Sequence, residues 1–432
     1  MGLISYLWTN SAAMAKKLPL GLQNFRKIID NGFLYVDKTP YLYQICSSPG
    51  SYFLSRPRRF GKSLTISTLQ ELYSGSRELF SGLWIEDKWD WTKKYPVVHL
   101  TLAGIGFVES GLETALHFLM DKQIRDVGLS PIQGGISNKF EYLIQELAKQ
   151  RKVVVLIDEY DAPIVHYLGT NLKQALHNRE LLKEFYTVLK TNDAHLELVF
   201  LTGVSKFSKT GIFSGLNNLV DLTMHPEYAT MLGYTQVELE SNFPEEIAVT
   251  ARHLQLSESE LLDRMRDWYN GYRFEENAGT VYNPVSVNNF FSQKKFENFW
   301  FATGTPTFLI QLLKQRGVFD LHTIGQSTLD FDSFDLEDVR LFGLLYQTGY
   351  LTMVSRDEFG QYTLDYPNRE VKYAMLAYLL EAFGGVSKGT GVSMAIQLER
   401  AFIGDNLEEV FRILAGFIAG QFELGNLQST KR

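Results

Sequence analysis

The first half of the chain alternates between short apolar runs and longer segments with apolar residues at helical spacing. Continuous apolar runs at 97–103, 152–163 and 196–207 predict buried strands. Between them, 139–150 and 179–190 carry apolar residues on one face, which predicts amphipathic helices. Strands that are apolar throughout and alternate with helices form parallel sheets covered on both faces. We therefore predict an α/β fold with a parallel sheet flanked by helices.

The pattern changes after about residue 228. Thr235 with Glu238, and Ser257 with Glu260, have the spacing of capping boxes that open helices. From there on, the apolar residues recur mainly at helical spacing, and the turns are rich in aromatic residues. We therefore expect two domains, listed by range: an α/β domain over 15–228 and a mostly α-helical second domain over 229–382.

Both ends of the chain are predicted to lie outside these domains. Residues 1–14 show no periodic pattern and end at a second methionine, so we expect a non-structural N-terminal extension. At the other end, 383–432 opens with the glycine-rich stretch GGVSKGTGVS, which predicts a linker. A helix follows, and its apolar face is expected to be exposed and to favour self-association. That face carries Leu407, Val410, Phe411 and Leu414.

Composition and charge argue against two broad classes of function. The chain has 432 residues, a formal net charge of −7 and a pI of about 5.7, which does not favour a surface coated for nucleic acid or membranes. No apolar run approaches the roughly 20 residues that a membrane helix requires. The single cysteine, Cys46, excludes an internal disulfide and a cysteine-rich zinc site. We expect a cytoplasmic protein without membrane contact and leave nucleic acid open as a partner.

The stretch FLSRPRRFGKSLTIS, residues 53–67, has the pattern of a phosphate-binding loop between a strand and a helix. In such a loop, backbone N–H groups and a helix N-terminus converge on anionic oxygens. Lys62 is expected to reach the terminal phosphates, and Ser63 to ligate Mg²⁺. Arg56 stands where a glycine is usual, and Pro57 removes one N–H donor, so the motif is degenerate. The residues expected to bind nucleotide are Arg56, Pro57, Arg58, Arg59, Phe60, Gly61, Lys62, Ser63 and Leu64.

Three arginines of this loop have more than one interpretation. A guanidinium suits phosphate because its planar fork offers paired donors, so one of the three is a candidate arginine finger. We favour the interpretation that at least one instead pairs with Asp37 or Asp161. A basic patch for DNA is the third interpretation, which the acidic chain does not favour. The three residues are Arg56, Arg58 and Arg59.

Two acids stand at the end of the second predicted strand. Asp158 is expected to hold Mg²⁺ through water, and Glu159 to polarise the attacking water as a general base. Alternatively, both acids only cap a helix or face solvent. Thr202 and Ser205, after the third strand, are candidate sensors of the γ-phosphate, or else ordinary strand-end hydroxyls. The candidate catalytic residues are Glu159, Lys62, Thr202 and Ser205, and the candidate metal ligands are Ser63 and Asp158.

Further motifs occur with these in one order across 17–380. They are YVDKT (35–39), RPRRFGKS (56–63), LIDEYD (156–161), TGVSKFSKTGIFSGLNNL (202–219), WYNGYRF (268–274), YNP (282–284), GTPTFLIQLL (304–313) and LLYQTGYL (344–351). Together they resemble the bacterial AAA-ATPase-like family of P-loop NTPases. In that family the arginine-rich loop is the normal form. The resemblance implies Mg²⁺-dependent ATP binding and hydrolysis that drives a conformational change, in mobile-element or defence biology.

Members of that family usually carry a C-terminal PD-(D/E)XK nuclease-like domain, and the sequence departs from that pattern. Glu370-Val-Lys372 has the letters of part of a nuclease motif, but no suitable acidic strand precedes it. We interpret the triplet as solvated charge, and 383–432 as a remnant before an absent nuclease-like domain. No nuclease activity is expected from this chain. The alternative to an ATP hydrolase is a non-hydrolysing ATP switch or an interaction module, with a homo-oligomer or protein partner left open.

Overall fold

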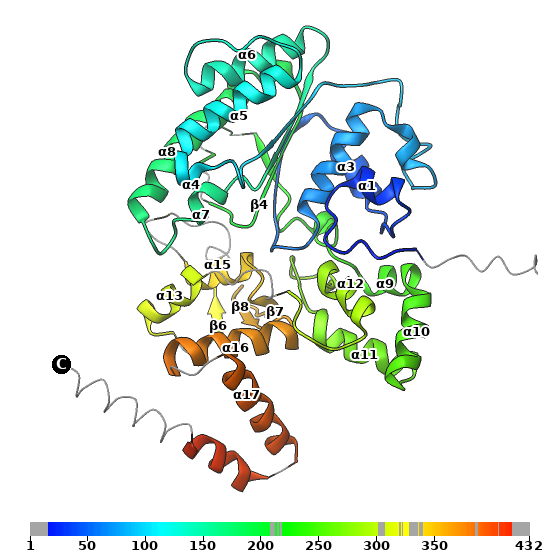
Figure 1. Ribbon diagram of the computed structural model, residues 1–432, viewed down its shortest axis with the longest axis vertical. Helices are drawn as coiled ribbons and strands as arrows, with labels where there is room; N and C mark the ends of the chain where they lie inside the picture. The colour runs from blue at the N-terminus through cyan, green and yellow to red at the C-terminus, as the bar shows by residue number, and fades with distance from the viewer. Residues whose placement is uncertain are drawn as a thin grey trace, which may run out of the picture.

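The computed structural model of the protein places an α/β domain above a second, mostly helical domain in the view of Figure 1. The predicted N-terminal extension, 1–14, lies outside the residues that the structure describes. Those residues are 16–207, 212, 213, 216, 218–300, 307–318, 321, 323–327, 336, 340–384, 388–404 and 406–416.

The first domain is built on a five-stranded sheet in the order β2-β3-β4-β1-β5, in which every neighbouring pair is parallel. This confirms the predicted parallel sheet. The register aligns Ser55 of β1 with Gly203 of β4, and Thr101 of β2 with Asp158 of β3. The carboxyl ends of the three central strands therefore meet at one edge. The strands are β1 Gly50–Ser55, β2 Val97–Thr101, β3 Val153–Asp158, β4 Leu196–Gly203 and β5 Leu219–Asp221.

Helices flank the sheet on both sides. In Figure 1, α1 and α3 lie on one side of the strands, while α5, α6 and α8 lie on the other. The α6 face predicted to be apolar is buried, as is the whole of β3, so this sheet is covered on both faces. The helices of this domain are α1 Phe25–Asp30, α2 Thr39–Cys46, α3 Lys62–Ser74, α4 Phe107–Ser110, α5 Leu112–Asp126, α6 Ile136–Ala148, α7 Ala162–Val165 and α8 Leu172–Thr191.

The second domain is mostly helical, as predicted, but it also contains a small antiparallel sheet that the sequence pattern did not reveal. Its order is β6-β8-β7. The strands are only four or five residues long, too short for a period-2 pattern to stand out. They are β6 Thr323–Gln326, β7 Thr352–Arg356 and β8 Tyr362–Asp365. The helices are α9 Gln236–Asn242, α10 Pro244–Leu254, α11 Glu258–Tyr269, α12 Pro284–Gln293, α13 Thr307–Arg316, α15 Leu341–Gln347 and α16 Arg369–Gly384.

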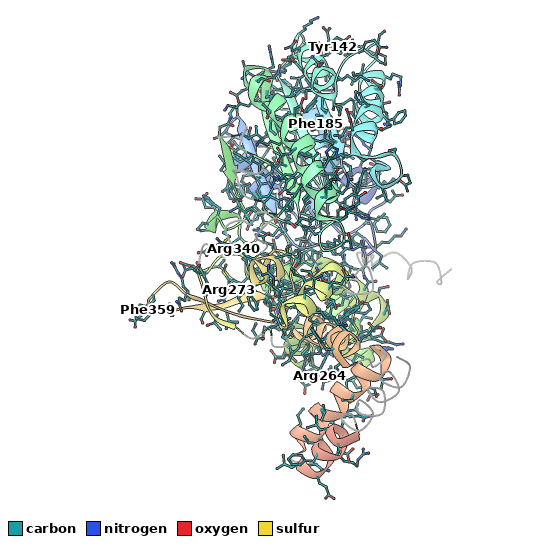
Figure 2. The ribbon with its side chains drawn as sticks, turned by 90° about the vertical axis from the view of Figure 1, so that its left-hand side faces the viewer. Tyr142, Phe185, Arg264, Arg273, Arg340 and Phe359 are labelled. Atoms are coloured by element: carbon teal, nitrogen blue, oxygen red, sulfur yellow. The ribbon has the colours of Figure 1, made fainter. Side chains whose placement is uncertain are left out.

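Both predicted capping boxes are present in this domain. Thr235 and Glu238 bond each other's backbone N–H groups at the start of α9, and Ser257 and Glu260 do the same at α11. Between β7 and β8, the turn places Phe359 at the tip of a hairpin that projects from the body of the protein, with 82% of its surface exposed (Figure 2). None of the helices in the described part of the chain is long and apolar enough to cross a membrane.

The predicted glycine-rich linker is wrong from residue 388 onward, because α17, Lys388–Ile403, is a helix. It packs against α16, where Gly391 lies beside Leu380. A further helix spans 407–416. Its Val410 is buried, whereas the other apolar residues of the predicted face are exposed: Leu407, Phe411 and Leu414.

The sequence-based domain boundary near residue 228 is crossed by the N-terminal segment. Leu34 and Val36 precede the phosphate loop in the chain, yet they pack in one apolar cluster with Tyr234, Leu239 and Phe243 of the second domain. The YVDKT motif therefore lies between the two domains, beside the carboxyl edge of the large sheet.

Candidate functional site

The predicted phosphate loop joins β1 to α3. Gly61 precedes the first residue of α3 and has a φ of 99°, a left-handed conformation that favours glycine. Arg59 also has a positive φ, of 71°, so the loop holds one strained non-glycine residue. The first turn of a helix leaves backbone N–H groups without partners inside the helix. This turn of α3 faces a cavity and supplies donors of the kind that bind phosphate.

Lys62 is buried beneath the loop. Its ammonium donates to the carbonyl oxygens of Arg56 and Pro57, each at 2.8 Å. Burial lowers the pKa of Lys62 to about 8, against the attraction of nearby carboxylates, foremost that of Asp158. The loop carbonyls thus hold this cation at the cavity, where phosphate oxygens can replace them as acceptors.

Asp158 ends β3 next to the phosphate loop. It is buried, and its Oδ1 has no hydrogen-bond partner among the residues that the structure describes. Asp158 and Ser63 line one cavity of about 540 Å³ that also reaches Thr101. A buried carboxylate oxygen without a donor is suited to a cation or to its water ligands. The two residues therefore fit the Mg²⁺ that the sequence predicts.

Glu159 follows Asp158 in a left-handed conformation with a φ of 51°. Such a backbone is unfavourable for glutamate and is found mostly where the surroundings enforce it. Burial raises the pKa of the Glu159 carboxyl, and the neighbouring Asp158 charge raises it further. Glu159 lines both the 540 Å³ cavity and the adjoining cavity at the phosphate loop. A carboxylate with a raised pKa at this position suits proton transfer.

Neither of the two residues predicted to be sensors lines the two cavities at this site. Thr202 is fully buried and donates its hydroxyl to the carbonyl of Leu54 at 2.9 Å, so it ties β4 to β1 and is not placed as a sensor. The Ser205 hydroxyl has no partner among the described residues, but Ser205 does not line either cavity. Asp161 does line the cavity, and it accepts from the backbone N–H groups of Val204 and Ser205.

Arg56 corrects the sequence interpretation most clearly. Arg56 does not line either cavity, and its guanidinium donates to the carbonyl oxygens of Ser55, Thr223 and Tyr228 at 2.9, 2.6 and 3.1 Å. It also lies over the ring of Phe274, 4.2 Å from the centroid. Burial lowers the pKa of Arg56 to about 10. Only the carbonyl of Arg56 faces Lys62. The side chain bonds carbonyl oxygens within the first domain and contacts Phe274 of the second domain, so it is not placed as a phosphate ligand or finger.

In the part of the chain that the structure describes, no ion pair joins a loop arginine to Asp37 or Asp161, the pairing that the sequence interpretation favoured. Asp37 accepts from the backbone N–H groups of Thr39 and Trp84, at 2.8 and 2.7 Å. Asp161 accepts hydrogen bonds from backbone N–H groups of the loop after β4, as described above. Arg58 is exposed, and together with Arg59 it lines the cavity at the phosphate loop. These two arginines therefore stay as candidates for contact with phosphate.

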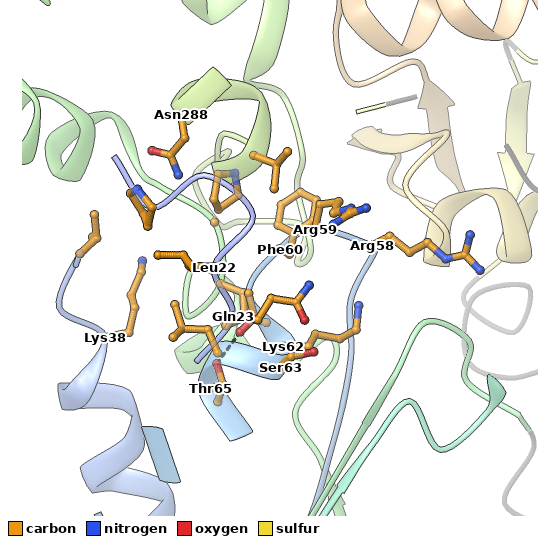
Figure 3. Close-up of a pocket in the computed structure, with 18 of the residues that line it drawn as sticks. Leu22, Gln23, Lys38, Arg58, Arg59, Phe60, Lys62, Ser63, Thr65 and Asn288 are labelled. Carbon is orange, nitrogen blue, oxygen red and sulfur yellow. Dashed lines mark hydrogen bonds between the residues drawn. The ribbon is translucent and has the colours of Figure 1, made fainter. Parts of the chain in front are cut away.

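The cavity at the phosphate loop has a volume of about 410 Å³ and continues between the domains. Figure 3 shows Ser63 and Thr65 at one end and Asn288 of α12 at the other. The far end contains residues to which the sequence interpretation assigned no chemistry, including Lys38 of the YVDKT motif. That motif resembled a family signature, but neither its spacing nor its composition indicated that α12 would lie opposite it.

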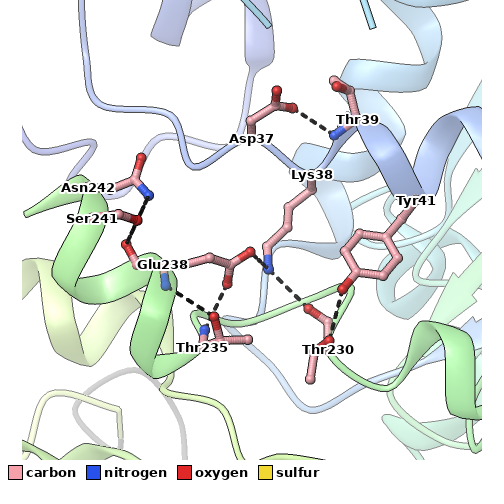
Figure 4. Close-up of polar contacts among 9 residues, drawn as sticks. All are labelled: Asp37, Lys38, Thr39, Tyr41, Thr230, Thr235, Glu238, Ser241 and Asn242. Carbon is pink, nitrogen blue, oxygen red and sulfur yellow. Dashed lines mark hydrogen bonds and ion pairs between the residues drawn. The ribbon is translucent and has the colours of Figure 1, made fainter. Parts of the chain in front are cut away.

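Lys38 links the N-terminal segment to the second domain, as Figure 4 shows. Its ammonium forms an ion pair with Glu238 at 2.6 Å and donates to the carbonyl of Thr230 at 3.0 Å. Burial lowers the pKa of Lys38, while Glu238 opposes that shift. Tyr41 shares a hydrogen bond with the hydroxyl of Thr230 at 2.9 Å. One wall of the cavity is therefore fixed to the cap of α9.

The second domain also contacts the phosphate loop directly. The indole of Trp300 donates to the carbonyl of Arg58 at 3.1 Å. Gly349, with a φ of 86°, packs against Pro57, where an added Cβ would come within 2.7 Å of the proline ring. Gln347 accepts from the backbone N–H of Lys206 in the loop after β4. The LLYQTGYL motif thus touches both loops at the carboxyl edge of the sheet.

The sequence interpretation treated Glu370 as solvated charge, and the structure contradicts this. The side chain is fully buried and accepts from the backbone N–H groups of Phe299 and Trp300, at 2.6 and 2.7 Å, and from the hydroxyl of Ser286. Burial raises the pKa of Glu370 to about 7. Glu370 therefore fixes the backbone of the residue whose indole holds the phosphate loop, while Lys372 is exposed.

These features define a P-loop protein: a parallel sheet, a glycine–lysine–serine loop at the start of a helix, and an acid at the end of β3, which β4 separates from β1. A family model described as "Predicted AAA-ATPase" matches residues 19–213. A relative from Azotobacter chroococcum mcd 1, an "Uncharacterized protein in vnfD 5'region", is 38% identical over 404 residues, 90% of this chain and 75% of that protein. The chain belongs to the AAA-ATPase-like family.

Two solved structures align more loosely. Cdc6p from Pyrobaculum aerophilum is 11% identical, with a TM-score of 0.32 over 80% of this chain and 92% of that chain. The ORC2 protein of Aeropyrum pernix, in ADPNP and ADP complexes, is 12% identical, with a TM-score of 0.32 over 88% of this chain and 96% of that chain. At these scores neither alignment informs the function of this chain.

Proposed function

We propose that the protein binds ATP with Mg²⁺ in the cavity between its domains and hydrolyses the nucleotide. The observation that carries this proposal is the sheet register, which brings the Lys62 loop and the two acids to one edge. Lys62 binds the terminal phosphates, and Ser63 and Asp158 hold the metal. Glu159 accepts a proton from the attacking water. Magnesium, when bound, neutralises phosphate charge.

Turnover is coupled to the second domain through its contacts with the phosphate loop. Trp300 and Gly349 touch that loop, and Gln347 touches the loop after β4. A change in either loop on hydrolysis therefore changes the packing of the second domain. We include in the proposal a cytoplasmic location, a protein or self-association partner, and the mobile-element or defence setting that the family resemblance implies.

Phosphate release by purified protein tests the proposal. The Glu159→Gln variant keeps the size of the side chain and is expected to turn over roughly a hundredfold more slowly, because a general base is lost. Its affinity for ATP is expected to stay within about threefold of wild type, since the phosphate contacts remain. Glu184→Gln, at an exposed position of α8, is the matched control and should match wild type.

The outcomes separate hydrolysis from binding alone. Wild-type turnover in Glu159→Gln would mean that another group activates the water, and Asp161 is then the next residue to test. Binding of ATP by wild type with no phosphate release would replace the hydrolase with the non-hydrolysing switch. The absence of any ATP binding would overturn the proposed function.

A further inference from the structure

The end of the 410 Å³ cavity remote from the phosphate loop contains a buried amide without full hydrogen bonding. Asn288 of α12 lines this cavity and is only 4% exposed. Its Oδ1 has no hydrogen-bond partner among the described residues. Its Nδ2 has one long hydrogen bond, of 3.4 Å, to the hydroxyl of Tyr234. A buried acceptor without a donor is costly, so its presence in a cavity indicates a ligand that supplies one.

The surroundings of Asn288 suit a flat, mainly apolar group. Apolar side chains from the N-terminal segment, from the loop before α9 and from α12 line the cavity. They are Leu22, Leu34, Val36, Met231, Leu232 and Val285. Ligand pockets of this kind combine apolar walls with a small number of polar groups that fix orientation. In Figure 3, Lys62 and Ser63 lie at the opposite end of the pocket from Asn288. Lys62 and the start of α3 account for the phosphate groups, so the ribose and the flat nucleobase remain for the rest of the cavity.

We propose that Asn288 is the residue that selects adenine. The adenine amine is a hydrogen-bond donor next to a ring-nitrogen acceptor, and an asparagine amide matches that pair with its oxygen and its NH₂ group. The O6–N7 edge of guanine presents two acceptors, which leave the Asn288 oxygen without a donor. This inference rests on the proposed function, because it assigns the base of the nucleotide bound there.

Binding of three triphosphates, ATP, GTP and purine riboside triphosphate, tests the inference by calorimetry. The third compound has the purine ring of ATP without the amine. Wild-type protein is expected to bind ATP at least tenfold more tightly than either of the others. In Asn288→Leu, which keeps the volume but removes both polar atoms, ATP affinity should fall to that of purine riboside triphosphate. Affinity for GTP should change less than threefold, which also reports that the variant is folded.

Asn289→Leu is the matched control, because its amide bonds the Val285 carbonyl within α12 and does not line the cavity. This variant is expected to keep the wild-type preference for ATP. Equal wild-type affinities for ATP and GTP, or a preference for GTP, would overturn the assignment while leaving triphosphate binding intact. An equal loss of all three ligands in Asn288→Leu would also overturn it. If wild type binds none of the three, the proposed function itself fails.

Discussion

The two ends of the cavity are built in different ways. The phosphate end comes from one continuous stretch, 58–65, and from residues that directly follow β3. The base end is assembled from three segments distant in the sequence: the N-terminal segment, the loop before α9, and α12. A contiguous motif can therefore predict the first, because a short loop fixes its own geometry. The second exists only once the domains have packed together.

Arg56 gives the sharpest way to break this comparison, because it belongs to the phosphate motif in sequence and to the domain junction in structure. Arg56→Ala removes three hydrogen bonds to carbonyls and the contact with Phe274. We expect the free energy of unfolding to fall by about 3 kcal/mol, as for loss of a buried charged donor. Urea denaturation measures this change.

Arg58→Ala is the control for that experiment, since Arg58 is exposed and its loss should alter stability by about 0.5 kcal/mol or less. Equal stability of Arg56→Ala and Arg58→Ala would show that the contacts of the Arg56 guanidinium do not stabilise the fold. The guanidinium would then be available to the nucleotide, as its place in the motif suggests.

Lys62 gives the next largest expected effect and belongs to the phosphate end alone. Lys62→Ala is expected to weaken ATP–Mg²⁺ binding at least tenfold, which is about 1.4 kcal/mol. Because the lysine contacts phosphate and not the base, GTP should lose the same factor, unlike in Asn288→Leu. In wild type, affinity should fall as the pH rises above about 8, where Lys62 loses its proton. Calorimetry across pH measures both effects, and unchanged ATP affinity in Lys62→Ala would contradict the phosphate-loop assignment.

The residues that sequence reasoning placed well share one property: their neighbours in the chain determine their position. The strands β2, β3 and β4, the helix α3 and the order of Asp158 and Glu159 follow from local patterns and from the parallel register. Arg56 was misassigned because a guanidinium in a basic loop has the same local signal whether it faces phosphate or a carbonyl cluster.

Other misassignments required knowledge of tertiary contacts. Glu370 was interpreted as solvated because no suitable acidic strand precedes it, yet three donors from other segments surround it. The sequence around Asn288 did not indicate a binding residue. An asparagine in a helix can be recognised as one only when the segments that line the same cavity are known. The small sheet of the second domain was missed because its strands are short and because β6 pairs with β8, which lies far from it in the sequence.

Glu370 gives the smallest expected effect. It tests whether a buried charge in the second domain influences the phosphate end of the cavity, because Glu370 bonds the backbone of Trp300. Its pKa is about 7 in the folded protein, against an ordinary value of 4.5. The folded state therefore binds the proton more tightly than the unfolded state does. The stability that this group contributes is fully present below about pH 4.5 and is lost as the pH rises through about 7. In Glu370→Gln, one oxygen still accepts from Phe299 and Trp300, and the new NH₂ group can donate to Ser286.

We therefore expect Glu370→Gln to equal wild type near pH 5 and to exceed its unfolding free energy by about 1 kcal/mol or more at pH 8. Urea denaturation of both proteins at the two pH values measures this difference, in which the other titrating groups cancel. Glu358→Gln, at the exposed hairpin turn, should show no such dependence. A pH-independent difference for Glu370→Gln would mean that the carboxylate is fully stabilised by its three donors. Because Trp300 stays anchored in this variant, ATP affinity should not change, and a loss of affinity would show that the charge of Glu370 reaches the phosphate end.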